Sequence, residues 1–140
     1  MDNCIFCKIL AKQLPSSRLY EDDHCTAFLD IRPVNPGHLL VIPNKHAASL
    51  AELDPDTGAQ MFRVGQRMAR ALRGGSVRCE GVNFHLADGS AAGQEVFHVH
   101  LHVFPRFAGD AFRVTLGSTL KNSPTKAELD AIAEKLSANL

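Results

Sequence analysis

The chain has 140 residues, of which 45% are hydrophobic, and its 15 lysines and arginines balance its 15 aspartates and glutamates. This length predicts a single domain with a core of its own, and the balanced charge excludes a bulk positive field that would attract a nucleic-acid polymer or a membrane. The stretch MDNCIFCKIL lacks a signal pattern and no run approaches the roughly 20 apolar residues that span a bilayer, so we expect a cytoplasmic protein with reduced thiols.

Five segments have the pattern of β-strands. Residues 18–20 and 25–29 are short strand-like runs around the polar turn EDDH. Residues 38–43, HLLVIP, are a nearly continuous apolar run, which is typical of a strand buried on both faces. Residues 82–87 and 97–104 alternate between larger apolar side chains and other residues. Together they predict an antiparallel sheet.

Two segments carry helix signals. Asp54 and Pro55 have the residue types of an N-cap and a first helical position, and the helix they begin is expected to end at residues 74–75, GG. Near the end of the chain, Thr125 and Glu128 have the spacing of a capping box ahead of an apolar stripe. Helices packed on an antiparallel sheet make an α+β domain.

Three histidines stand at every second position in FHVHLHVFPR, at His98, His100 and His102. Alternate residues of a strand share a face and lie ~6.7 Å apart along it. The three imidazoles are therefore expected on one face, and the intervening apolar residues, together with Phe97, on the core side.

Three interpretations of the histidine strand are open from the residues alone. It is a polar surface, a metal site, or a nucleophile with its supports, because a neutral imidazole nitrogen can attack phosphorus and later leave. The small residues of the preceding loop DGSAAG and the amide of Gln94 favour an anionic substrate, since such a loop can direct backbone N–H groups at a phosphate.

Several motifs together resemble one known family. HVHLHVF matches the His-φ-His-φ-His-φ-φ signature of the histidine triad (HIT) family, where φ is apolar. AAGQEVFH, PRFAGD, CIFCKI and AFLDIRPVNPGHLLVIPNKH are similar to the same family, in the same order along the chain. The chain is identified as resembling a bacterial-type, hydrolase-like HIT protein with a CxxC zinc motif.

The resemblance implies one HIT domain over residues 1–140, with a core at about 4–112 and a C-terminal helical extension at about 113–140. It implies a homodimer, and hydrolysis or transfer at the α-phosphate of a purine nucleotide conjugate through a covalent nucleotidyl-histidine. By this analogy His100 is the nucleophile, His102 supports the site by hydrogen bonding, and His98 lies near the leaving group.

The resemblance also implies a nucleotide-binding set. Gln94 would contact the phosphate, and Asp30 would accept both ribose hydroxyls with its two oxygens. Without the resemblance, the apolar members of the set would be assigned to the core. The implied nucleotide contacts are Ile5, Phe6, Ile9, Phe28, Asp30, Ile31, Gly93, Gln94, Glu95, His100 and His102.

The spacing of Cys4 and Cys7 is that of two zinc ligands, but two cysteines are half a site, and two buried thiols are an equally simple interpretation. The resemblance implies that His46 and His98 complete a structural zinc site. Such a closed site has no open position for a water molecule. No organic cofactor is implied.

Two departures from the family leave the substrate open. Ala87 stands where relatives carry an amide, and Glu95 stands where many carry a hydroxyl. Dinucleoside polyphosphates, nucleoside phosphoramidates and adenylylated compounds all stay possible substrates. The alternatives to the nucleophilic mechanism are a metal-dependent hydrolase with the triad as ligands and a nucleotide-binding protein with little catalysis. His38 is expected to be structural. Arg32 is expected to be a surface charge, with contact to the distal phosphates of a long substrate as the alternative.

Overall fold

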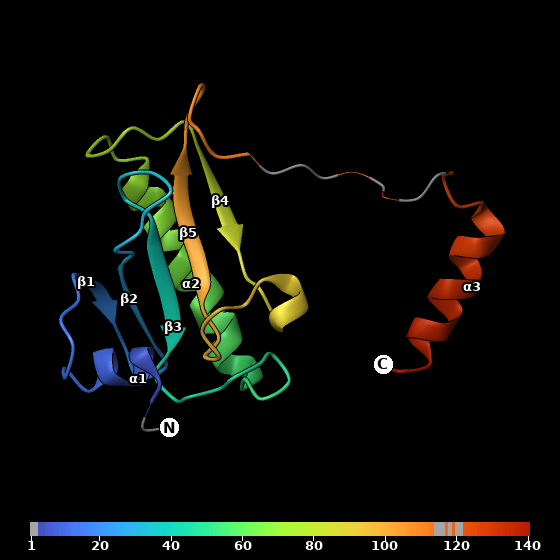
Figure 1. Cartoon of the computed structure of the whole chain (residues 1–140), viewed down its shortest axis with the longest axis horizontal. Helices are drawn as coiled ribbons and strands as arrows, with labels where there is room; N and C mark the ends of the chain where they lie inside the picture. The colour runs from blue at the N-terminus through green and yellow to red at the C-terminus, as the bar shows by residue number, and fades with distance from the viewer. Residues whose placement is uncertain (1–2, 114–116, 118, 120–121) are drawn as a thin grey trace.

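The computed structural model describes residues 3–113, 117, 119 and 122–140, and in this part of the chain five strands form one sheet (Figure 1). Every neighbouring pair of strands is antiparallel, in the order β1-β2-β3-β5-β4. This architecture confirms the predicted α+β fold class. The strands are β1 (Arg18–Glu21), β2 (Cys25–Leu29), β3 (Leu39–Pro43), β4 (Gly81–His85) and β5 (Leu101–Arg106).

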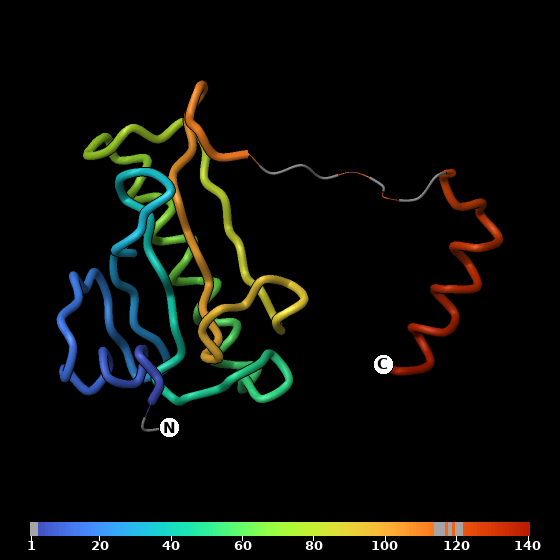
Figure 2. Tube along the Cα trace, in the orientation of Figure 1, coloured from blue at the N-terminus to red at the C-terminus, as the bar shows by residue number. Residues whose placement is uncertain are grey.

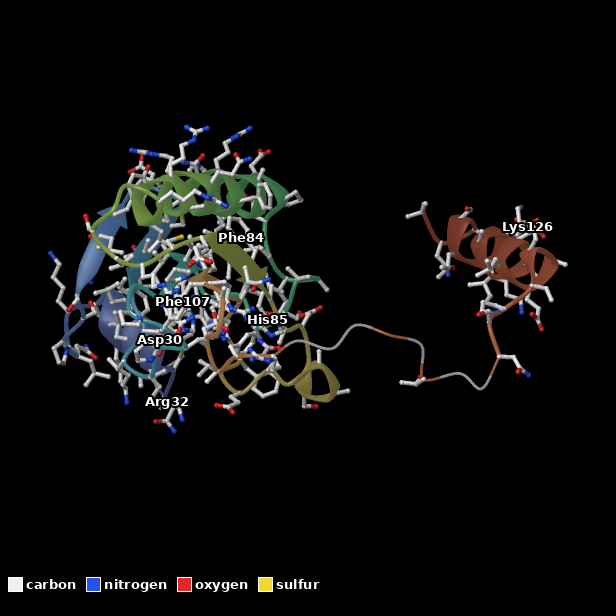
Figure 3. The ribbon with its side chains drawn as sticks, turned by 90° about the horizontal axis from the view of Figure 1, so that it is seen from above. Asp30, Arg32, Phe84, His85, Phe107 and Lys126 are labelled. Carbon is white, nitrogen blue, oxygen red and sulfur yellow. The ribbon has the colours of Figure 1, made fainter. Side chains whose placement is uncertain are left out.

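Helices lie on both faces of the sheet. The long helix α2 (Pro55–Leu72) covers one face, and the short helix α1 (Ile5–Leu10) lies on the other, which Figure 3 shows from above. A 3₁₀ turn, η1 (Ser90–Ala92), lies in the loop between β4 and β5, and α3 (Lys126–Ser137) follows the sheet domain.

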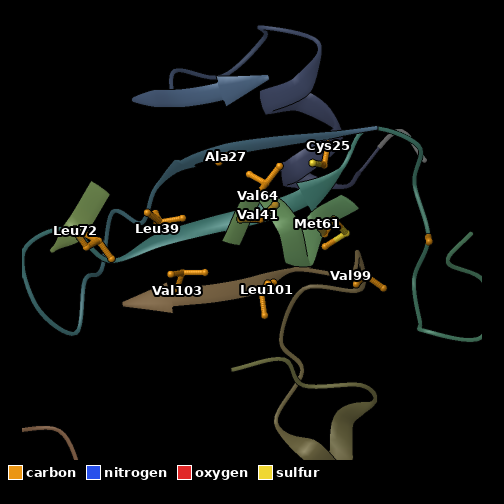
Figure 4. Packing of buried hydrophobic residues seen from close by; sticks show 11 residues of the cluster. Cys25, Ala27, Leu39, Val41, Met61, Val64, Leu72, Val99, Leu101 and Val103 are labelled. Carbon is orange, nitrogen blue, oxygen red and sulfur yellow. The ribbon is translucent and has the colours of Figure 1, made fainter. Parts of the chain in front are cut away.

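The larger core lies between the sheet and α2. Alternate residues of β3 and β5 point toward the helix, among them Val41 and Val103, which are fully buried. Met61 and Val64 of α2 pack against them (Figure 4). The helix begins as predicted, since the Asp54 carboxylate accepts the Thr57 N–H at 2.8 Å.

The second, smaller core explains the apolar run of β3. Leu40 and Ile42 point away from α2 and pack with Phe28 of β2 and with Phe6 and Ile9 of α1. Every residue of β3 is buried, so this strand is covered on both faces, as its sequence predicts. The face under α1 is also the face of the histidines.

The predicted strand over residues 97–104 is partly wrong, because β5 begins only at Leu101. Its pairing with β3 stops at Val41, opposite Leu101. Beyond that point the carbonyl of Pro43 accepts a hydrogen bond from the His98 ring at 2.9 Å. Phe97 is 54% exposed and does not join the core as expected. The segment before β5 therefore does not pair with a neighbouring strand. Its role is to position side chains.

The C-terminal helix forms as its capping box predicts. The Thr125 hydroxyl accepts the Glu128 N–H, and the Glu128 carboxylate accepts the Thr125 N–H at 2.7 Å. None of its residues is buried against the described part of the chain, and Figure 1 draws it apart from the sheet. The predicted extension also runs through residues 114–116, 118 and 120–121, which lie outside the described residues. Among the described helices, none has the length and apolar character required to cross a membrane.

Candidate active site and metal centre

His100 has one free ring nitrogen. Its Nδ1 lies 2.7 Å from the carbonyl oxygen of His98, an acceptor only, so the Nδ1 carries the proton and donates it. A neutral imidazole has a single N–H, and therefore Nε2 keeps its lone pair. The residue is 7% exposed and lines a cavity of about 670 Å³. This arrangement presents a fixed, unprotonated nitrogen to whatever enters the cavity.

The cavity walls match the predicted nucleotide set closely. α1 contributes Ile5, Phe6 and Ile9, and the end of β2 and its following loop contribute further residues, including Asp30. Every predicted contact lines the cavity except Gln94. The wall is thus mainly apolar, with one carboxylate near the histidines, as suits a flat base carrying a ribose.

Gln94 is buried, and its side chain is already occupied. Its amide oxygen accepts the Gly89 N–H at 2.7 Å, and its amide nitrogen donates to the carbonyls of Ala48 and Val96 at 2.8 and 3.1 Å. These bonds fix the loop that leads to the histidines. The predicted contact between Gln94 and a phosphate stays a prediction, and this geometry gives it no support.

His102 takes its tautomer from His38. The Val34 N–H donates to Nδ1 of His38 at 3.0 Å, so the proton of His38 is on Nε2. That nitrogen lies 2.9 Å from Nδ1 of His102, which must accept, and the proton of His102 is therefore on Nε2. His102 also lines the cavity and can donate this N–H to a bound phosphate.

Burial keeps this pair of imidazoles neutral. It lowers the pKa of His102 to about 4, and the charges that His100 and His38 would carry when protonated act in the same direction. Burial also lowers the pKa of His38, against the opposing effect of Asp30. The Asp30 carboxylate lies 3.7 Å from Nε2 of His38 and 3.9 Å from Nδ1 of His102. A neutral His102 is a hydrogen-bond donor at pH 7, not a source of a full positive charge.

The four predicted zinc ligands converge on one point. The Sγ of Cys4 lies 3.4 Å from Nδ1 of His98, and the Sγ of Cys7 lies 3.4 and 3.7 Å from Nδ1 of His46 and His98. The two Nδ1 atoms are 3.2 Å apart. The N-terminal segment is thereby held against the turn that leads into β5 (Figure 2).

These spacings fit a tetrahedral zinc ion. Bond lengths of about 2.3 Å to sulfur and 2.05 Å to nitrogen place sulfur and nitrogen ligands roughly 3.5 Å apart and two nitrogens roughly 3.3 Å apart. The protonation also fits, because Nε2 of His98 donates to the Pro43 carbonyl and leaves Nδ1 free. Burial lowers the pKa of His98, which keeps the imidazole neutral, as a ligand must be.

His98 links the cysteine-histidine group to the cavity residue His100. Its ring belongs to the ligand group, while its carbonyl fixes His100. Phe6, between the two cysteines, packs edge-on against the rings of His98 and His100, with centroids 5.7 and 5.2 Å apart. Because both nitrogens of His98 are engaged and its side chain is fully buried, its predicted place beside the leaving group stays a prediction without geometric support.

The triad nitrogens do not form a ligand set of their own. Within the described residues, only two groups have ligand atoms close enough together for one ion, the cysteine-histidine group above and Asp30 with His38 and His102. In the second group the Nε2 of His38 carries a proton, because the Val34 N–H occupies its other nitrogen. A protonated nitrogen cannot ligate a metal, so this geometry does not favour the triad as a catalytic metal site.

A family model described as HIT domain matches residues 11–109. The chain belongs to the HIT family. An uncharacterised HIT-like protein of Borreliella burgdorferi is 47% identical over 121 residues, covering 86% of this chain and 87% of that protein. The crystal structure of a HIT family protein from Bacillus anthracis has a TM-score of 0.91 and 39% identity, covering 99% of this chain and 98% of that one. A zinc-bound histidine triad family protein from Mycobacterium smegmatis has a TM-score of 0.76 and 39% identity, covering 99% of both chains.

Two residues that line the cavity of this HIT chain, His38 and Arg32, were absent from the predicted nucleotide contacts. His38 sets the tautomer of His102, although its residue type alone suggested a structural role. Arg32 lines the mouth of the cavity and lies 3.4 Å from Glu95. The NPGH sequence before β3 was the only local pattern that could have drawn attention to His38. It could not reveal the role of His38, because its partner His102 is 64 residues away in the chain.

Proposed function

We propose that this HIT protein hydrolyses a purine nucleotide conjugate at its α-phosphate through a nucleotidyl-His100 intermediate. The free Nε2 of His100, fixed inside a cavity that suits a nucleotide, carries the proposal. Proteins of the HIT family bind nucleotides, which supports the class of substrate. The second ring nitrogen of His100 is tied to a backbone carbonyl, so the ring cannot turn away from the cavity without losing that bond.

In the first step the lone pair of His100 Nε2 forms a bond to the α-phosphorus. The bond from phosphorus to the leaving group breaks, and the leaving group departs with that electron pair and takes a proton from water. The positive charge that develops on the imidazole is stabilised by the Nδ1–H bond to the His98 carbonyl. The N–H of His102 donates to a non-bridging phosphoryl oxygen, which gains charge during the attack.

In the second step water attacks the phosphorus. The phosphorus–nitrogen bond breaks, its electron pair returns to Nε2, and the proton of the water passes to solvent. Nucleoside monophosphate and the protonated leaving group are the products, with one water consumed. Asp30 holds the ribose through both hydroxyls; its Oδ1 already accepts the Arg32 N–H at 2.8 Å and has a second lone pair available.

A structural zinc ion forms part of the proposal. Cys4, Cys7, His46 and His98 would hold it, and the zinc-bound Mycobacterium smegmatis relative supports this assignment. Bound there, zinc supplies cross-linking of α1 to the sheet, because a site with four protein ligands has no position for substrate or water. The same contacts keep the apolar cavity wall of α1 in place.

The test is a rapid alkaline quench followed by intact mass measurement. Diadenosine triphosphate and an adenosine 5′-phosphoramidate are the substrates, because phosphoramidate bonds to histidine survive base better than acid. We expect a mass gain of one adenylyl group in the wild-type protein and none in His100→Ala. Turnover of the variant should fall at least about a thousandfold, since its nucleophile is absent.

His100→Ala must keep the fold for this comparison, which circular dichroism and nucleotide binding would establish. Near-normal turnover in a folded variant would contradict the covalent mechanism. Tight nucleotide binding without turnover or adduct in the wild-type protein would instead support a binding protein.

A further inference from the structure

The cavity contains few charges. Apart from histidines, the charged side chains among its described lining residues are Asp30, Arg32 and Glu95. Two of the three are carboxylates, and Asp30 is assigned to the ribose in the proposed function, on which this inference rests. The leaving group of a substrate would therefore meet one guanidinium and one carboxylate.

Those two groups are paired with each other among the residues that line the cavity. The guanidinium of Arg32 lies 3.4 Å from the carboxylate of Glu95. Arg32 follows β2, and Glu95 lies 63 residues later, in the loop ahead of the histidines. Figure 3 shows Arg32 and Asp30 on the side of the sheet opposite α2. Both members of the pair are strongly exposed, at 83% and 79%, and such pairs stabilise little. A ligand can thus separate them.

We propose that Glu95, restrained by Arg32, selects the leaving group by its charge. The pair disfavours polyphosphate leaving groups and favours leaving groups that carry a cation, such as an amine with a second ammonium group. Glu95 is a specificity-determining residue in this assignment, and Arg32 limits its effect.

The charge balance gives the physical reason. A nucleoside polyphosphate leaving group carries several negative charges. Among the described residues that line the cavity, Arg32 is the one lysine or arginine, and it is already paired with a carboxylate. That carboxylate repels the polyphosphate and attracts an ammonium group. A neutral amine of the same length experiences neither effect. In the phosphoramidate case the phosphorus–nitrogen bond breaks, and the amine leaves with the electron pair and takes a proton from water.

Three substrates test the assignment. The first is adenosine 5′-phosphoramidate of 1,4-diaminobutane, whose free amine is protonated. The second is the corresponding n-butylamine compound, which matches it in length and lacks the charge. The third is diadenosine triphosphate, whose leaving group is a polyanion. The measured quantity is kcat/KM for each substrate in the wild-type protein, Glu95→Gln and Arg32→Gln.

In the wild-type protein we expect a cationic preference of about threefold to tenfold over the butylamine compound. Glu95→Gln should bring that ratio close to one and raise kcat/KM for diadenosine triphosphate by a similar factor. Arg32→Gln should act in the opposite direction on both, because it removes the cation that neutralises Glu95. A purely structural role of the pair would change all three substrates alike in both variants.

A matched control is Asp130→Asn, which removes one carboxylate from an exposed ion pair with Lys126 on α3, outside the cavity. Its substrate ratios should equal those of the wild type. Turnover that depends on His100 together with an unchanged ratio in Glu95→Gln would overturn the selectivity and leave the proposed function standing. Absence of His100-dependent turnover with every substrate would overturn both.

Discussion

His102 is a half-buried imidazole whose protonation is less favourable in the folded protein than in the unfolded chain. Its side chain is 24% exposed, and its pKa is lowered to about 4, chiefly by burial, whereas an unfolded chain leaves it near 6.5. Between these values the unfolded chain binds more protons. The contribution of His102 to the unfolding free energy is therefore fully present above pH 6.5 and declines as the pH falls toward 4.

The consequence is acid sensitivity that depends on this residue. Between pH 7 and pH 5 we expect His102 to cost the fold about 2 kcal/mol of unfolding free energy. Denaturant unfolding at both pH values would measure it, and the loss should be smaller in His102→Asn. His24→Asn, which changes an exposed histidine, is the control and should show the wild-type loss. An equal loss in His102→Asn would mean that other groups carry the pH dependence.

In the proposed mechanism we expect His38 to act on catalysis through His102. His38→Ala removes the donor that fixes the His102 tautomer, so the N–H at Nε2 is no longer enforced. We expect kcat to fall about 10- to 100-fold, the usual cost of losing a supporting hydrogen bond of this kind, with a smaller change in nucleotide affinity. Steady-state kinetics together with equilibrium nucleotide binding would separate the two. A loss confined to binding would assign His38 to the cavity wall instead.

For single residues, the sequence predicted which residues belong to the site better than it predicted what each of them does. Alternation indicated the histidine face, because those residues carry their own signal. Only the HIT resemblance indicated the cavity wall, since its apolar residues would otherwise be assigned to the core. The tautomer chain through Val34, His38 and His102 depends on contacts between distant segments, which no local pattern encodes. The hydrogen bonds of Gln94 could not be predicted for the same reason, since its partners are backbone groups of three separate residues.

Helix α2 packs tightly against the sheet at Gly65. A Cβ there would lie 3.0 and 3.1 Å from ring atoms of Phe84 and 3.2 Å from a methyl group of Leu101. Gly65→Ala should lower the unfolding free energy by about 1–2 kcal/mol, because crowding outweighs the gain in helix propensity. Thermal or denaturant unfolding would measure the change.

Gly58 in the first turns of the same helix is the matched control. A Cβ at Gly58 meets one flexible side chain, that of Leu53, at 3.3 Å. Gly58→Ala should leave the stability unchanged or raise it by up to about 1 kcal/mol. If both variants behaved alike, propensity and not packing would decide the effect at Gly65.

Helix α1 is six residues long and has no side-chain N-cap, so its position depends on contacts with the rest of the protein. Zinc removal by a chelator, or Cys7→Ser, should lower the melting temperature by roughly 10 °C, the effect expected for a ligand present at about a thousand times its dissociation constant. Nucleotide affinity should fall as well, because α1 is a cavity wall.

Elemental analysis should find zinc in the wild-type protein and Cys79→Ser, but not in Cys7→Ser. Zinc-free wild-type protein with full stability would contradict a structural metal.

The elements themselves were largely predictable. The apolar run of β3 and the cap of α2 are local features, and both form where the sequence indicates. The start of β5 was not predictable, because the Pro43 carbonyl bonds to the ring of His98. The same ring also contacts Cys4 and Cys7, which lie in a distant segment of the chain.

For the whole molecule the open question is what α3 packs against. Its apolar side chains Leu129, Ile132 and Leu136 are 49–62% exposed, and a helix of this length is marginal in water by itself. We propose a homodimer in which α3 contacts the second copy. Light scattering should give twice the mass of one chain, and deletion of residues 123–140 should weaken the association without changing the fold of residues 3–113. A monomer at micromolar concentration would contradict it.

The ring of His98 belongs to the cysteine-histidine group and its carbonyl holds His100, so the histidine strand cannot be moved into another protein by itself. If only the three alternating histidines were copied into another sheet, the residue that replaces His100 would have as its Nδ1 partner a carbonyl that nothing holds in place. The helix with the CxxC motif and His46 would have to be moved as well, because these residues contact His98, whose backbone carbonyl holds His100. For this protein the histidine triad site is a piece of tertiary structure, and its seven-residue signature is only the part of it that is contiguous in the chain.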